Sequence, residues 1–132
     1  MGLSENQIDS SLQKAILESF QDGLFTIDRN WQYSYVNESA ARMVGKEVED
    51  LVGKKLFDVF PEVVETEFYQ YYKEVMENGT PLSFDQEYAP LKKWFKGNIY
   101  PYDNGITIVF TDNTDRKKME IELAEYAKRL EW

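Results

Sequence analysis

Hydrophobic residues recur at helical spacing at the N-terminal end of the chain, at Ile8, Leu12, Ala15, Ile16 and Phe20. Ser4 and Gln7 precede them in the arrangement of a capping box, in which two side chains satisfy backbone N–H groups at the start of a helix. We therefore predict an amphipathic helix within residues 1–21, ended by Gly23, which permits a reversal of the chain.

Alternating hydrophobic and polar positions predict five short strands. Residues 24–28 and 32–36 form the first pair, joined by a tight hairpin at Arg29 and Asn30. Three more strand-like runs follow, at residues 82–88, 93–100 and 106–111. Asn104 and Gly105 both tolerate a positive φ, so we expect a second tight hairpin with these two residues at its centre.

The stretch between the two groups of strands carries short helical signals. Asn37 has the side chain of an N-cap and predicts a helix over residues 38–44. A second short helical segment over residues 46–51 ends at Gly53, and residues 56–60 are expected to form an apolar turn.

Two longer helices follow in the pattern. Pro61 suits the first position of a helix that runs to residue 77 and is ended by Asn78 and Gly79. The last helix covers residues 115–132, with Thr114 as its expected N-cap.

This order of elements predicts an α+β fold. Two N-terminal and three C-terminal strands can form one five-stranded antiparallel sheet, and the helices between them then cover one of its faces. Such a layout leaves a pocket between the sheet and the long middle helix. The predicted organisation is an N-terminal cap helix over residues 1–21, a core over 22–114 and a C-terminal signalling helix over 115–132.

Composition excludes several kinds of function. The net charge of −9 argues against a nucleic-acid partner and against an anionic membrane surface. The chain has no cysteine and no histidine, so the commonest nucleophile, general base and metal ligands are missing. No metal site and no catalytic residue is therefore predicted. The lack of a secretory signal and of a long apolar run favours a cytoplasmic location without membrane insertion.

Several short motifs occur in an order typical of one family. They are DGLFTID at residues 22–28, YVN at 35–37, LVGKKLF at 51–57, NGT at 78–80, WF at 94–95, YP at 100–101 and TDNTDRK at 111–117. The sequence resembles the PAS domain, or sensory box, of bacterial and archaeal sensor histidine kinases in two-component systems. This resemblance implies a non-catalytic domain that senses a signal or dimerises, and that relays to an attached effector such as a histidine kinase.

The familiar PAS chromophores do not fit this sequence. Light-sensing relatives bond flavin through a cysteine, and the matching position is Leu56. Haem-binding relatives use a histidine on the long helix, which this chain lacks. No cofactor is therefore predicted: haem and a covalent flavin do not fit, and nothing in the sequence points to a non-covalent flavin, which stays open. A pocket with an unidentified small molecule and a filled hydrophobic core without a ligand both remain open.

The family resemblance, together with strand alternation, suggests which side chains line the pocket. The long helix contributes one stripe, and Gly97 is expected to leave space in the middle of a strand. A cationic ligand meeting Asp85 and Glu87 is a further interpretation. The predicted pocket residues are Phe25, Ile27, Leu56, Tyr69, Tyr72, Met76, Phe95, Gly97, Ile99, Ile108 and Phe110.

The C-terminal helix carries a stripe with the spacing of a coiled-coil seam. We predict a homodimer through one or both terminal helices, with Asp112 and Thr114 as the junction that passes a signal to the last helix. The alternative is that both stripes pack on their own domain. The predicted dimer residues are Ile8, Leu12, Ile16, Met119, Leu123, Tyr126 and Leu130.

Three functions are weighed: a ligand-sensing module of a signalling protein, a PAS domain kept only for dimerisation, and a small enzyme of a cone-shaped α+β fold. The third is disfavoured because the expected pocket is apolar and the chain has no histidine.

Overall fold

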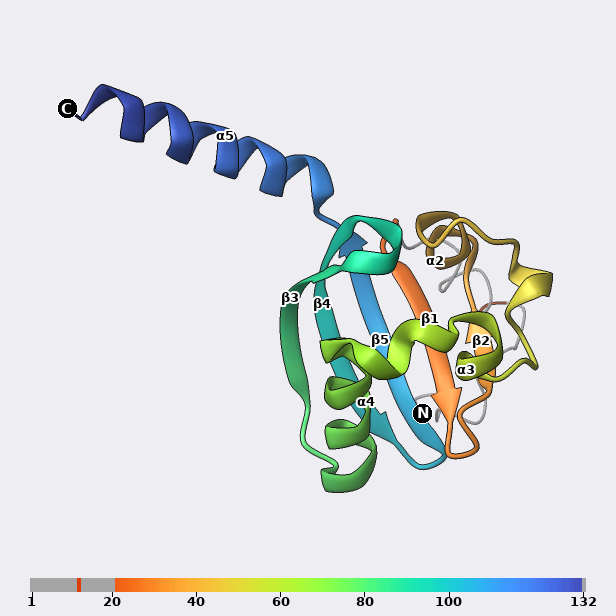
Figure 1. Cartoon of the computed structure of the whole chain (residues 1–132). Helices are drawn as coiled ribbons and strands as arrows, with labels where there is room; N and C mark the ends of the chain where they lie inside the picture. Colours follow the sequence, from red (N-terminus) through yellow and green to blue (C-terminus); the bar gives the residue numbers. More distant parts are fainter. Residues whose placement is uncertain (1–11, 13–20, 132) are drawn as a thin grey trace, which may run out of the picture.

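Five antiparallel strands form a single sheet in the order β2-β1-β5-β4-β3 (Figure 1). This description comes from a computed structural model, in which residues 12 and 21–131 are described. The strands are β1 (Gly23–Asp28), β2 (Tyr33–Val36), β3 (Leu82–Tyr88), β4 (Lys93–Tyr102) and β5 (Gly105–Asp112). The predicted sheet is confirmed, and β5, the last strand of the chain, lies at its centre.

One face of the sheet is apolar because strand alternation points the same class of side chain to the same side. Phe25 on β1 pairs with Ile108 on β5, which in turn pairs with Ile99 on β4. All three side chains are buried. The core therefore lies on this face of the sheet.

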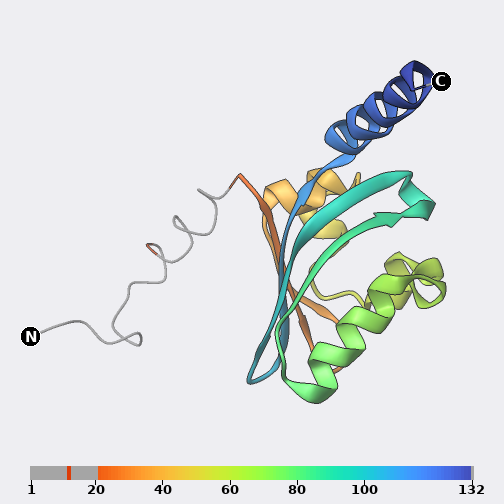
Figure 2. The ribbon, with the colours of Figure 1, turned by 90° about the vertical axis from the view of Figure 1, so that its left-hand side faces the viewer.

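Helical segments cover that apolar face, as the edge-on view shows (Figure 2). Asn37 caps the first of them by accepting a hydrogen bond from the Ala40 N–H at 2.8 Å, as predicted. The segments are α2 (Glu38–Met43), the 3-10 turn η2 (Val48–Asp50), α3 (Leu56–Val59), the 3-10 turn η3 (Pro61–Glu65), α4 (Glu67–Asn78) and the 3-10 turn η4 (Ala89–Leu91).

The long helix predicted from Pro61 is interrupted. Thr66 has an extended backbone between η3 and α4, and its side-chain hydroxyl donates to the Val63 carbonyl at 2.8 Å. The Thr66 N–H donates to the same carbonyl, so the turn closes there and a new helix begins.

Two short segments also differ from expectation. Residues 46–51 form only the single turn η2, which is closed by reciprocal capping between Glu47 and Asp50. Residues 56–60, expected as a turn, contain the helix α3.

The hairpin between β4 and β5 is shifted by one residue from the predicted position. Tyr102 pairs with Gly105, so the central residues are Asp103 and Asn104. Gly105 has a φ of +156°, and a Cβ atom there would lie 1.9 Å from the carbonyl oxygen of Ile27. A glycine is required at position 105 because β1 approaches so closely, and not because of the turn.

The last helix, α5 (Thr114–Leu130), leaves the sheet at the end of β5 and projects away from the core (Figure 1). Thr114 is its first helical residue and not its N-cap, which is Asn113. The predicted N-terminal helix, with Ile8 and Ile16, lies outside the described residues, apart from Leu12, which is helical and exposed.

Candidate functional site

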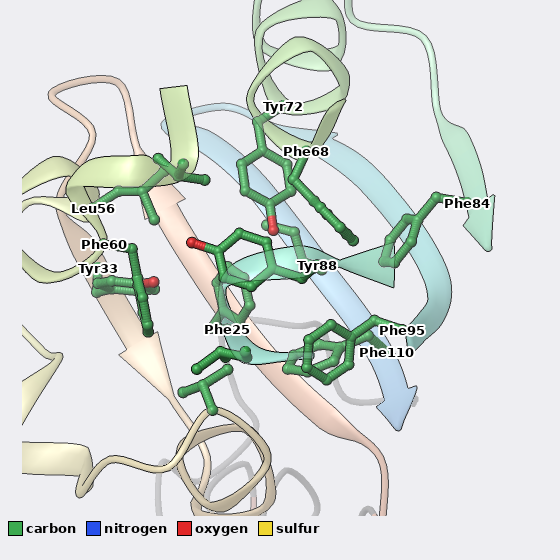
Figure 3. A pocket seen from close by; sticks show the side chains of 14 residues that line it. Phe25, Tyr33, Leu56, Phe60, Phe68, Tyr72, Phe84, Tyr88, Phe95 and Phe110 are labelled. Carbon is green, nitrogen blue, oxygen red and sulfur yellow. The ribbon is translucent and has the colours of Figure 1, made fainter. Parts of the chain in front are cut away.

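A small cavity lies between the apolar face of the sheet and the helical layer (Figure 3). Its volume is about 50 Å³. Aromatic rings make up most of its wall, and many of them meet edge to face, as Phe25 does with Tyr33 and Phe110. The lining residues are Phe25, Tyr33, Val44, Leu56, Phe60, Val63, Phe68, Tyr72, Phe84, Tyr88, Leu91, Phe95, Ile108 and Phe110.

Six of the eleven predicted pocket residues line this cavity: Phe25, Leu56, Tyr72, Phe95, Ile108 and Phe110. Ile27 and Ile99 are fully buried in the core beside it. Tyr69 lies elsewhere, with its ring 5.6 Å from those of Trp31 and Phe57. Met76 packs against the core from its edge.

Gly97 does not leave space for a ligand. A Cβ atom at this position would lie 2.0 Å from the carbonyl oxygen of Val109 and 2.8 Å from the Cα of Phe110. The backbone of β5 therefore already occupies the space that the missing side chain was expected to open.

The helix α4 presents a different stripe from the predicted one. Its buried residues are Phe68, Tyr72 and Val75. Only Tyr72 is shared with the predicted stripe, whose other members, Tyr69 and Met76, each lie one position further along the chain. Phe68 packs on two rings of the strand β3, with Phe84 at 5.3 Å and Tyr88 at 5.7 Å. The apolar spacing of Phe68, Tyr72 and Val75 is also helical, so this stripe was present in the sequence.

The strand β3 supplies two lining residues that the sequence reasoning missed. Phe84 and Tyr88 are buried, whereas Asp85 is exposed. Phe84 and Tyr88 therefore face the cavity, and a cationic ligand in it does not meet Asp85 or Glu87 on the opposite face of the strand. The alternation of Phe84 and Tyr88 was the signal for this assignment.

Three tyrosine hydroxyls belong to the wall. The Tyr88 hydroxyl donates to Oε1 of Glu62 at 3.0 Å. Burial raises the pKa of Tyr72, and burial reinforced by the neighbouring Tyr72 and Tyr88 raises the pKa of Tyr33. For Tyr88, burial and the hydrogen bond to Glu62 also raise the pKa. All three therefore remain neutral phenols.

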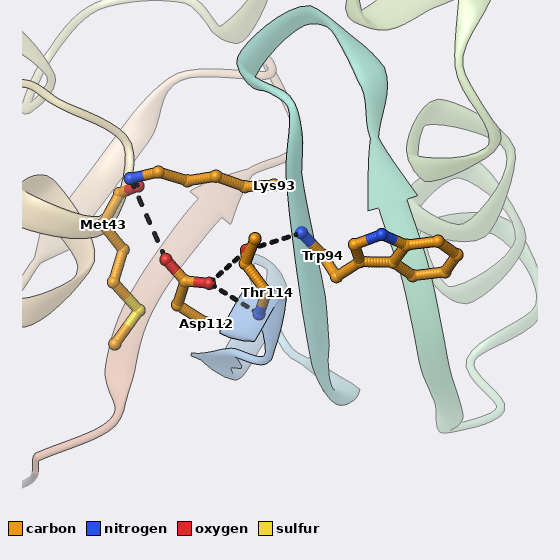
Figure 4. Close-up of polar contacts among 5 residues, drawn as sticks. All are labelled: Met43, Lys93, Trp94, Asp112 and Thr114. Atoms are coloured by element: carbon orange, nitrogen blue, oxygen red, sulfur yellow. Dashed lines mark hydrogen bonds and ion pairs between the residues drawn. The ribbon is translucent and has the colours of Figure 1, made fainter. Parts of the chain in front are cut away.

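A second polar cluster joins β5 to α5 (Figure 4). Oδ1 of Asp112 accepts from the Thr114 N–H at 3.0 Å and from the Thr114 hydroxyl. The Thr114 hydroxyl oxygen in turn accepts a hydrogen bond from the backbone N–H of Trp94 at 3.0 Å. Thr114 thus ties the first turn of α5 to β4, as well as to the end of β5.

The same cluster reaches the helical layer through Lys93. Its Nζ lies 3.9 Å from Oδ2 of Asp112 and donates to the Met43 carbonyl at 2.8 Å. The junction therefore connects β4, β5, α2 and α5 at one point.

Lys117, one turn into α5, adds a further attachment. Its Nζ lies 3.2 Å from Oδ2 of Asp85 on β3 and 5.3 Å from the centre of the Trp94 ring. Asp85 thus pairs with the last helix. Because these groups are partly exposed, the ion pair is expected to be weak, so it orients the helix more than it stabilises the fold.

Beyond this turn α5 has no contact with its own sheet that buries it. The four predicted dimer residues on it, Met119, Leu123, Tyr126 and Leu130, are 59–66% exposed. The alternative in which this stripe packs on its own domain is therefore wrong for α5.

The part of the chain from residue 21 to residue 131 holds no group of three or more acidic side chains that could bind a metal ion. None of its helices is both long and apolar enough to span a bilayer.

Comparison with known proteins identifies one matching family and many solved structures of similar fold. The sequence matches the family described as PAS fold over residues 17–118. A sensory box sensor histidine kinase from Vibrio cholerae is similar in structure, with a TM-score of 0.60, 15% identity and coverage of 78% of this chain and 90% of that one. No curated protein matches the chain.

Two further solved structures are similar to the same extent. The PAS domain of a protein from Colwellia psychrerythraea has a TM-score of 0.62 and 15% identity, over 81% of this chain and 99% of that one. The PAS domain of BvgS from Bordetella pertussis has a TM-score of 0.59 and 14% identity, over 92% of this chain and 95% of that one. At these identities the likeness concerns the fold alone.

Proposed function

This chain belongs to the PAS family, and on that premise we propose that it is a sensory domain that responds to a small molecule or partner and transmits the response through α5 to an attached effector such as a histidine kinase. PAS domains are generally sensory and non-catalytic. The fold itself does not specify the signal, which depends on the pocket and on its connection to α5 through the junction. The absence of cysteine from the sequence is compatible with the cytoplasmic location that we include in it.

The observation that carries the proposal is that several residues lining the pocket lie only one or two positions along the chain from residues of the junction. Phe95 lines the cavity and directly follows Trp94, whose N–H is bonded to Thr114. Phe110 lines it two residues before Asp112, and Val44 lines it next to Met43. A change in the packing of these rings therefore acts on the residues that hold the first turn of α5.

The output of the domain is proposed to be a change in a homodimer. The exposed stripe on α5 has the spacing of a short coiled-coil seam, and a second copy of the same helix would bury it. With one residue, Asn113, between β5 and α5, the movement of the strand end is not absorbed by a flexible linker. The dimer seam then rotates or slides.

A second candidate function is a PAS domain that only dimerises. The cavity of about 50 Å³ favours this alternative, because pockets for drug-sized ligands usually measure about 300–1,000 Å³. If the domain only dimerises, filling the cavity leaves the position of α5 in the dimer unchanged.

An experiment can separate the two. The chain has no cysteine, so Lys128→Cys on α5 accepts one spin label per protomer. The distance between labels in the dimer is then measured by double electron–electron resonance. Val63→Phe adds four carbon atoms at the wall of the cavity, whereas Val64→Phe adds them at a neighbouring exposed position.

We expect Val63→Phe to shift the distance by about 1–2 Å, the amplitude typical of helix shifts at interfaces. Val64→Phe should leave it unchanged. An unshifted distance in a folded Val63→Phe protein would favour the dimerisation module, and a protein without any measurable distance between labels would contradict the homodimer.

A further inference from the structure

Two tyrosine hydroxyls face the cavity without a partner in the described part of the chain, although the side chains that carry them are largely buried. Tyr33 and Tyr72 are only 4% and 7% exposed. Neither hydroxyl is hydrogen-bonded to another residue in the described part of the chain, whereas that of Tyr88 is bonded to Glu62. Buried polar groups are normally hydrogen-bonded, so this pair of free donors points to a partner that is not part of the chain.

The two hydroxyls reach accessible space. No fully enclosed side-chain nitrogen or oxygen among the described residues lacks a partner. The oxygens of Tyr33 and Tyr72 therefore border a space that a water molecule can enter. Figure 3 shows these two side chains approaching the cavity from β2 and α4, with their hydroxyl groups turned into it.

The chemistry of the wall narrows the class of partner. None of the fourteen described residues that line the cavity carries a charged side chain. An anion would find no cation there, and an unpaired ion in an apolar site is strongly unfavourable. The rings and aliphatic side chains favour a small apolar body, and the two hydroxyls favour one acceptor atom on it.

The volume of the cavity limits the size of the partner. A water molecule occupies about 30 Å³ in the liquid, so a cavity of about 50 Å³ takes about two non-hydrogen atoms before the rings have to move. A flavin or haem is far larger than this space.

We propose that the cavity binds a short-chain neutral oxygen compound, a ketone, aldehyde or alcohol, whose oxygen accepts hydrogen bonds from the hydroxyls of Tyr33 and Tyr72. This assignment rests on the proposed sensory function, because it names the class of molecule to which the domain responds.

Four probes of nearly the same shape test the assignment. Acetone is neutral with an acceptor, 2-methylpropene lacks the acceptor, acetate is an anion and acetamidinium is a cation. Each is titrated into the full chain, and the shifts of tyrosine and phenylalanine ring signals are followed by NMR. We expect saturable binding of acetone, with weaker binding of the other three.

Variants identify the hydrogen bonds. Tyr72→Phe and Tyr33→Phe keep the ring and remove one donor, and each should weaken acetone binding about two- to ten-fold, the effect of one net hydrogen bond. Tyr100→Phe, at a 44% exposed position on β4, is the matched control and should bind as the parent protein does. Thermal melting establishes that each variant is folded.

Equal binding of 2-methylpropene would overturn the role of the hydroxyls, and tighter binding of acetate or acetamidinium would overturn the neutral ligand class. The absence of saturable acetone binding would also overturn the assignment, leaving water as the partner of the hydroxyls. These results are independent of the spin-label distance in Val63→Phe, so a wrong ligand class and a wrong sensory function are distinguishable.

Discussion

Removal of one apolar side chain from the α5 stripe should dissociate the proposed dimer. Leu123 lies in the middle of the stripe and is 65% exposed. Leu123→Ser removes the apolar surface that a second copy would bury, and it leaves the sheet and the cavity untouched. Ile121→Ser is the matched control, because Ile121 is on the same helix, 49% exposed, and outside the stripe.

The magnitude follows from the exposed area. Complete burial of a leucine side chain contributes about 1.5–3 kcal/mol, so burying the exposed part of Leu123 contributes about 1–2 kcal/mol. The dimer contains the side chain twice, so the variant loses about 2–4 kcal/mol. This corresponds to a rise in Kd of about 30- to 700-fold.

Such a loss should be visible because the dimer is expected to be marginal. Four stripe residues in two copies contribute about 8–16 kcal/mol. The loss of translational and rotational freedom on association opposes this with about 4–15 kcal/mol.

Sedimentation equilibrium of the full chain from micromolar to millimolar concentration measures these dissociation constants. The parent and Ile121→Ser should dimerise with similar constants, and Leu123→Ser should be largely monomeric. An unchanged Kd for Leu123→Ser, or an equal rise for both variants, would refute the seam and indicate association through another surface.

Three further predictions concern stability. Gly97→Ala places a methyl group against the Val109 carbonyl and should lower the free energy of unfolding by about 1–3 kcal/mol, measured with urea; an unchanged midpoint would show that β4 and β5 do not approach so closely. Asn37→Ala, at a side chain that is 1% exposed and hydrogen-bonded to Leu24, Ala40 and Asp22, should lower it by about 2–4 kcal/mol, and a loss below about 0.5 kcal/mol would contradict the buried cap. The raised pKa values of the cavity tyrosines mean that they ionise more readily in the unfolded chain, so their stabilisation is complete below about pH 10 and is lost as the pH rises further, by about 1.4 kcal/mol per pH unit for each tyrosine. Tyr72→Phe should reduce this alkaline slope in pH-dependent urea unfolding, and an identical slope would count against the burial of its hydroxyl.

The strands were predictable because their signal is local. Alternation along residues 24–28 and 106–111 assigns each side chain to a face without knowledge of the neighbouring strand. The Asn37 cap was predictable for the same reason, since its partner Ala40 is only three residues away.

The stripe of α4 was not predictable to the residue. Two sets of apolar positions, one with Tyr69 and one with Phe68, fit helical spacing almost equally well. The contacts of Phe68 with Phe84 and Tyr88 on β3 decide which of the two sets is buried, and the sequence of α4 alone does not contain them. The break at Thr66 also depends on a hydrogen bond to Val63 that competes with continued helix.

Gly97 illustrates the opposite error. A glycine within a strand is compatible with an open space and with close approach of another backbone. The sequence around Gly97 is the same in both cases, and only the position of β5 distinguishes them.

The sequence by itself therefore determined the order of the elements, the apolar faces of β1, β4 and β5, the direct connection of β5 to the last helix and the apolar stripe along that helix. Each of these depends on residues close together in the chain. The tertiary structure decided which aromatic rings meet around the cavity, that two tyrosine hydroxyls there have no partner among the described residues, and that Thr114 bonds to Trp94. These features depend on the register and packing of segments far apart in the chain, for which local periodicity carries no information.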